Sequence, residues 1–264
     1  MLSVSFAALQ TEQSQEKYST DPTSAYQTKQ SEMESLLNEG VEAAGKDPEM
    51  LLKVTRAAEN VSTDIAVTAA QRAVEARPSP EAYLLLVDAL SVKYIFLQGE
   101  ERQSLMKRAE TAARSANKLT RVPTVEMRVK LGGILKDEGQ YAESESLLRA
   151  ALLSAQGDNN TDLRFQAIRS LIECAAAQNK PEEERSWFAE LAKNDKANAF
   201  DWDSHGDMLY AAKDFKGAGD AYSRAAALIT RDWCNAGTAY EMASETDSAL
   251  YAERQCIEKL QGTT

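Results

Sequence analysis

Glycine and proline are scarce in this sequence: 12 and 6 of the 264 residues. Both residues interrupt helices, so a chain with few of them has few obligatory breaks. The residues that replace them, chiefly alanine, leucine, glutamate and glutamine, are strong helix formers. The composition therefore favours helix almost throughout and predicts an all-α fold class.

Histidine and cysteine are nearly absent, with one histidine, His205, and three cysteines. A single histidine excludes the H-E-x2-H zinc pair, and the sequence contains no C-x2-C pair, no G-x4-G-K-[ST] phosphate loop and no G-x-G-x2-G fingerprint. A serine or cysteine nucleophile would have only His205 as its imidazole base. We therefore expect no catalysis, no cofactor and no metal, and we interpret His205 as a packing residue.

Basic residues are outnumbered, 30 against 41 acidic ones, which gives a net charge of −11. This charge repels nucleic-acid backbones and anionic lipid surfaces, so neither is an expected partner. The longest apolar stretch, 82–97, contains Asp88 and Lys93 and is shorter than the roughly 20 residues of a membrane-spanning helix.

A secretory signal would need a basic segment before its apolar core, and the first basic residue here is Lys17. Residues 1–9 form at best a truncated signal. The sequence therefore favours the cytoplasm, with the periplasm or secretion as the alternative.

Two tryptophan-glycine phrases lie near the C-terminus, and each is followed by an alanine twelve residues after its glycine. They consist of Trp202, Gly206, Leu209, Ala218 and Tyr222, and of Trp233, Gly237, Tyr240 and Ala249. A phrase used twice at this distance indicates a structural repeat, which decides the architecture before any single motif.

These phrases resemble the tetratricopeptide repeat (TPR), in which large, small and aromatic residues on one helix meet an alanine and an aromatic on a second. Equivalent positions recur at Val54, Val87, Gly132, Ile172, Gly206 and Gly237, at spacings of 33, 45, 40, 34 and 31 residues. The resemblance implies a right-handed superhelical solenoid of about six helix-turn-helix repeats.

The predicted organisation has three parts: a disordered segment over 1–22, a capping helix over 23–46 and the repeat array over 47–261. Apolar residues at 3.6-residue spacing, from Met33 to Ala44, predict the amphipathic capping helix. The first helix of the second repeat runs on through Tyr94, Ile95 and Phe96. We expect this extension to pack internally, with a subunit contact as the alternative. An extra loop over 157–162 precedes the fourth repeat, whose second helix is predicted to start at Pro181.

The signature residues are expected to act in packing, because a helical hairpin of this size survives only by stacking on its neighbours. Gly206 and Gly237 would allow the two helices of a repeat to approach closely. The antiparallel hairpin of the last repeat would also bring Cys234 and Cys256 near one another. We predict that these two cysteines can form a disulfide in an oxidising compartment, whereas Cys174 is a small core residue.

In TPR proteins the first helices line a concave groove that holds a segment of a partner protein. The resemblance assigns to this groove the residues Arg169, Glu173, Phe200, Asp203, Asp207 and Tyr210. Its acidic members argue against the lysine-rich clamp that holds C-terminal carboxylates in one TPR subclass. We therefore expect a non-catalytic scaffold or adaptor that binds a basic or mixed-charge protein segment. The alternatives are a structural subunit of a larger assembly or homo-oligomer and, third, a helical enzyme or small-molecule binder.

Overall fold

The computed structural model describes residues 22–155, 161–192, 197–228 and 232–261, and within them the chain forms thirteen α-helices and no strand. The predicted all-α fold class is confirmed. The chain divides into two compact units, residues 1–123 and 124–264.

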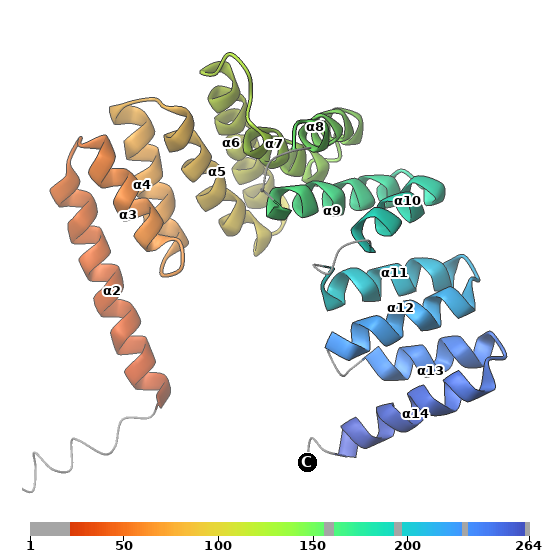
Figure 1. Cartoon of the computed structure of the whole chain (residues 1–264). Helices are drawn as coiled ribbons and strands as arrows, with labels where there is room; N and C mark the ends of the chain where they lie inside the picture. Colours follow the sequence, from red (N-terminus) through yellow and green to blue (C-terminus); the bar gives the residue numbers. More distant parts are fainter. Residues whose placement is uncertain (1–21, 156–160, 193–196, 229–231, 262–264) are drawn as a thin grey trace, which may run out of the picture. The chain divides into compact units, whose positions relative to one another are not determined.

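The first unit contains a long helix, α2 (Pro22–Ala44), and two antiparallel hairpins (Figure 1). The hairpins are α3 (Pro48–Ala58) with α4 (Thr63–Ala76) and α5 (Pro80–Ile95) with α6 (Gly99–Lys118). Proline opens both first helices, where its missing N–H would have no helical partner. The side chains of Asp47 and Ser79 cap them by accepting backbone N–H groups at 2.9 and 3.1 Å.

The second unit contains four further hairpins, so the described residues hold the six that the repeat spacing predicts. They are α7 (Val125–Asp137) with α8 (Tyr141–Ser154), α9 (Thr161–Ala177) with α10 (Pro181–Ala192), α11 (Ala199–Ala211) with α12 (Phe215–Leu228), and α13 (Trp233–Met242) with α14 (Thr246–Gln261). All six marker positions, from Val54 to Gly237, lie on the first helix of a hairpin. The helix predicted to start at Pro181 does start there.

The four hairpins of the second unit turn in the same way. Each first helix ends with a residue in the left-handed conformation: Gly139, Asn179, Lys213 and Ser244, with φ between 55° and 76°. The next N–H donates to the carbonyl five residues earlier, at 2.8 Å from Gln140 to Leu135 and 2.9 Å in the other three turns. This bond closes a Schellman motif and satisfies a carbonyl that the helix end leaves open.

Small residues form much of the core of both units. Ala109 and Ala116 of α6 and Ala218 and Ala225 of α12 are fully buried. In the second unit one cluster centres on Leu148, Ile168 and Leu171, and another on Tyr222 and Tyr240. Trp202 and Met208 pack against both clusters and thereby join them.

A helix, α2, occupies most of the range 23–46 predicted for the capping helix, but two apolar segments of the first unit are more exposed than the sequence predicts. Only the last turns of α2 are buried, at Val41 and Ala44, whereas Met33 and Leu36 are 47% and 66% exposed. The apolar face of α2 is longer than the α3–α4 hairpin can cover, so the part that contains Met33 and Leu36 remains exposed to solvent. Similarly, α5 buries Tyr94 but leaves Ile95 and Phe96 64% and 82% exposed, so the extension does not pack internally beyond Tyr94.

Two predicted segments lie largely outside the described residues. They are the N-terminal segment 1–22 and the loop 157–162, of which only the helical ends are described.

Candidate interaction surfaces

The α11–α12 hairpin depends on the absence of a side chain at Gly206. A β-carbon at this position would lie 2.5 Å from the ring of Tyr222 on α12. The Tyr222 ring therefore lies directly against the backbone of α11, and its hydroxyl donates a hydrogen bond of 2.8 Å to Asp207 on the next turn. The glycine thus fixes the position of an acidic side chain as well as the packing of the hairpin.

His205 has a packing role. Its ring stacks on Phe188 of α10, with centroids 4.6 Å apart and planes inclined by 11°, and Trp202 lies 6.1 Å away. Burial lowers the pKa of His205, and the positive charges of Arg224 and Arg185 act in the same direction. The neutral ring therefore joins the fourth hairpin to the fifth, as the sequence predicts for a packing histidine.

Four of the six predicted groove residues share one face of α11, because they are three or four residues apart along the helix. Phe200, Asp203, Asp207 and Tyr210 are called here the acidic face. Phe200 is 75% exposed, Asp207 is exposed, and Asp203 and Tyr210 are half-buried. The Tyr210 ring meets Phe215 edge-on at 5.2 Å. The face therefore combines an exposed aromatic ring with two carboxylates.

The other two predicted groove residues, Arg169 and Glu173 on α9, are held in ion pairs. Arg169 donates two hydrogen bonds of 2.7 Å to Asp201, whose side chain is 4% exposed. Asp201 also accepts the Asn198 N–H at 2.8 Å in a capping box that starts α11. Glu173 pairs with Lys136 of α7 at 2.5 Å. Both residues therefore connect neighbouring first helices, α9 to α11 and α7 to α9.

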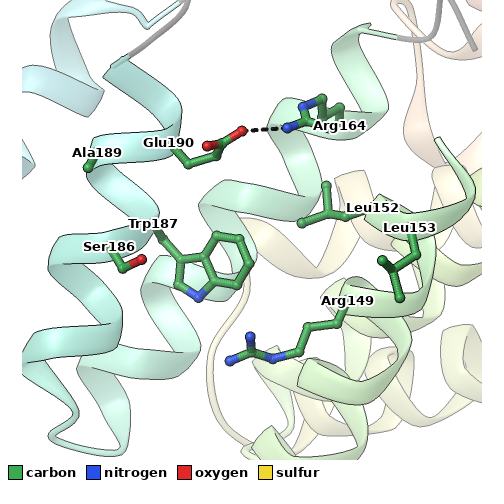
Figure 2. Close-up of a pocket in the computed structure, with 8 residues that line it drawn as sticks. All are labelled: Arg149, Leu152, Leu153, Arg164, Ser186, Trp187, Ala189 and Glu190. Carbon is green, nitrogen blue, oxygen red and sulfur yellow. Dashed lines mark hydrogen bonds and ion pairs between the residues drawn. The ribbon is translucent and has the colours of Figure 1, made fainter. Parts of the chain in front are cut away.

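A pocket of about 490 Å³ lies in the second unit, between α8, α9 and α10. Figure 2 shows Trp187 at its centre, with Leu152 and Leu153 on the facing side and an ion pair between Arg164 and Glu190 at one edge. Arg149 lies over the Trp187 ring at 5.1 Å and also pairs with Glu183 at 2.6 Å. Because these charges are already paired, the pocket offers mainly the indole ring and the 69% exposed Leu153 to an apolar group.

Sequence reasoning did not find this pocket. One signal was present: Trp187 is the only one of the three tryptophans outside the repeated phrase. A large aromatic residue that the repeat pattern does not explain is a candidate for contact with a ligand or partner.

Cys234 and Cys256 form a disulfide between the start of α13 and the end of α14, with their Cα atoms 5.1 Å apart. The predicted proximity of this pair is confirmed. Cys174 is a free, buried cysteine whose Sγ lies 3.5 Å from the hydroxyl of Ser144. Burial raises the pKa of its thiol, which keeps it uncharged.

Among the residues described, no group of three or more histidine, cysteine or acidic side chains is arranged to hold a metal ion. None of the described helices is long and apolar enough to cross a membrane.

No protein-family profile and no curated protein matches this sequence. Solved structures do match. PilF of Pseudomonas aeruginosa has a TM-score of 0.61 and 17% identity, over 83% of this chain and 95% of PilF. A tetratricopeptide repeat protein of Parabacteroides merdae has a TM-score of 0.53 and 13% identity, over 83% and 84%.

The APC/C hetero-tetramer Cut9–Hcn1 contains a similar chain, with a TM-score of 0.57 and 15% identity, over 87% of this chain and 43% of the other. At such identities the likeness concerns the fold. Together with six hairpins, the repeated tryptophan-glycine phrase and glycine-to-aromatic packing, it shows that this chain has the tetratricopeptide repeat fold.

Proposed function

We propose that the chain is a non-catalytic interaction scaffold whose acidic face binds a basic or mixed-charge segment of a partner protein. The observation that carries this proposal is the 75% exposed ring of Phe200 on the same helix face as Asp203 and Asp207. An exposed aromatic residue beside carboxylates can contact an apolar side chain and a lysine or arginine of the same segment.

The surroundings of the acidic face favour a fixed binding surface. A hydrogen bond from the Tyr222 hydroxyl holds the Asp207 carboxylate in place, and the Arg169–Asp201 ion pair fixes the start of α11 against α9. A surface that is ordered before binding loses less entropy when the partner arrives.

The nearby charges also select the sign of the partner. Arg169 of α9 is paired with Asp201 and Lys136 of α7 with Glu173, so these two basic side chains are already neutralised. The net charge of −11 attracts basic segments at long range. The similar chain in the Cut9–Hcn1 hetero-tetramer is part of a protein assembly, which supports a role in binding proteins.

Two model peptides of opposite charge test this proposal. We expect a fluorescent peptide of alternating lysine and leucine to bind at least about tenfold more tightly than its glutamate-leucine counterpart at low salt, and to weaken as salt rises. The double substitution Asp203→Lys and Asp207→Lys should abolish this preference.

The matched control is the double substitution Glu32→Lys and Glu39→Lys on α2, which changes the net charge by the same amount at exposed positions outside the acidic face. It should retain most of the affinity for the basic peptide. Equal binding of both peptides to the unchanged protein, or unchanged preference in the double-lysine variant, would refute the acidic face as the binding surface.

We also propose that the protein works in an oxidising compartment. The Cys234–Cys256 disulfide supports the periplasm or secretion over the cytoplasm, because cytosolic thiols are kept reduced. When the protein is extracted and unfolded in the presence of an alkylating reagent, one cysteine, Cys174, should be modified. Three modified cysteines would indicate a reducing compartment.

A further inference from the structure

The sixth hairpin, α13–α14, exposes a helix face whose equivalent is buried in the fifth hairpin, α11–α12. On α12, Gly219 and Ala226 are buried, and Gly219 faces α13: a β-carbon at Gly219 would lie 2.6 Å from the ring of Tyr240. The hydroxyl of Tyr240 also donates a hydrogen bond of 2.8 Å to Asp220 of α12. This face is where one hairpin stacks on the next.

The corresponding positions of α14, 31 residues later, are Leu250 and Ile257, and they are 55% and 54% exposed. They are seven residues apart and therefore lie two turns apart on one side of the helix. Glu253 and Arg254 lie between them and are also exposed. Within the part of the chain that the structure describes, neither is in an ion pair.

The size of these side chains selects the kind of neighbour that fits. Gly219 and Ala226 leave space for the aromatic ring of the next first helix, whereas Leu250, Arg254 and Ile257 fill that space. A neighbour of the same design as α13 would therefore collide with them. A helix that offers apolar groups at matching intervals, with opposite charges between them, would fit.

A second copy of α14 has this pattern. When two copies lie antiparallel with a two-fold axis between positions 253 and 254, Leu250 of one copy lies opposite Ile257 of the second copy. Glu253 of each copy then lies opposite Arg254 of the other. Each apolar and each charged contact occurs twice, as a two-fold interface requires.

We infer that α14 is the contact surface of a two-fold homodimer of this protein. The Cys234–Cys256 disulfide holds α14 against α13 before association, so little ordering is left to the dimer. One helix from each copy buries less than the roughly 800 Å² per partner of a standard interface. The dissociation constant is therefore expected in the micromolar range.

The test is the molar mass in solution, by sedimentation or light scattering, between about 1 and 100 µM protein. The unchanged protein should shift from monomer to dimer. Leu250→Glu with Ile257→Glu should remain monomeric, with an unchanged helical circular dichroism signal. The matched control is Leu36→Glu, which alters a 66% exposed apolar residue in the first unit and should still dimerise.

Charge exchange tests the two-fold geometry itself. Glu253→Arg alone and Arg254→Glu alone each place like charges opposite one another and should weaken the dimer at least tenfold. The double variant Glu253→Arg, Arg254→Glu, and an equimolar mixture of the two single variants, should recover it. A monomer at every concentration, a dimer insensitive to the changes on α14, or no recovery in the mixture would overturn the inference.

Discussion

The fifth and sixth hairpins, α11–α12 and α13–α14, share the tryptophan-glycine phrase but pack against different neighbours. Tryptophan, glycine and alanine recur at Trp202 and Trp233, Gly206 and Gly237, and Ala218 and Ala249. The residue that covers the glycine differs. Tyr222 lies on Gly206, whereas Glu253 lies on Gly237. The positions that face along the stack differ as well, from Gly219 and Ala226 to Leu250 and Ile257.

This difference shows which parts of the phrase build the hairpin and which parts serve its surroundings. The fifth hairpin has neighbours on both sides, and its His205 stacks on the fourth hairpin while its Gly219 admits Tyr240 of the sixth. The sixth has Ala236 at the histidine position and has a disulfide between its helices. Packing against two neighbouring hairpins stabilises the fifth hairpin, whereas a disulfide between its two helices stabilises the sixth.

The largest expected effect is that of breaking the disulfide. In the chain-entropy account, a bond between cysteines 22 residues apart stabilises the closed loop by roughly 3 kcal/mol. Reduction should therefore speed amide hydrogen exchange in α13 and α14 much more than in α11 and α12. The variant Cys234→Ser, Cys256→Ser should exchange at the reduced rate with or without reductant. Equal acceleration in both hairpins would contradict the comparison.

The glycines provide the second test. A methyl group at Gly206 meets the Tyr222 ring, which is only 5% exposed, so Gly206→Ala should lower the free energy of unfolding by about 1 to 3 kcal/mol. At Gly237 the nearest atom is Cγ of the flexible, exposed Glu253, at 2.9 Å. Gly237→Ala should change the stability by less than about 1 kcal/mol, because the better helix propensity of alanine offsets the contact. Urea denaturation of both variants measures these two changes in the free energy of unfolding.

The smallest expected effect is a pH dependence at the joint between the fourth and fifth hairpins. Because burial lowers the pKa of His205, the folded state binds a proton less readily than the unfolded state, whose histidine pKa is about 6.5. Stability should therefore be constant above about pH 6.5 and decrease as the pH falls below it.

His205→Phe keeps a ring against Phe188 and should remove this part of the pH dependence between about pH 7 and 5. A loss of stability that persists in that variant would place the titrating group elsewhere. Glu184 would act in the opposite direction, because burial raises its pKa and the folded state then gains stability as the pH falls. Thermal unfolding at a series of pH values measures both proteins.

The predictions from sequence were most accurate where one residue type has one physical use. Glycine at a close helix contact and proline at a helix start are examples, and Gly206, Gly237 and Pro181 lie where they were expected. The turn residues were harder to find. Asn179, Lys213 and Ser244 take the same left-handed conformation as Gly139, although their side chains share no property that marks it. The Schellman bonds hold that conformation at the end of each first helix.

The acidic face and the Trp187 pocket also show which features the sequence could predict and which it could not. Helical spacing places Phe200, Asp203, Asp207 and Tyr210 on one face, and this follows from position along the chain alone. The sequence could not show that Arg169 and Glu173 are held by Asp201 and Lys136, because both pairs join residues more than 30 positions apart. It also did not show that Trp187, Arg149 and Leu153, from two different hairpins, surround one pocket.

The sequence by itself determined the helical class, the hairpin repeat and the nearness of Cys234 to Cys256, because each follows from local preference or from the period of the repeat. Only the tertiary structure decided which faces are covered. It buries Gly219 and exposes Leu250 at equivalent positions of two consecutive hairpins. Burial depends on what lies beside a helix: α13 covers the face of α12 on which Gly219 lies, whereas no described helix covers the equivalent face of α14.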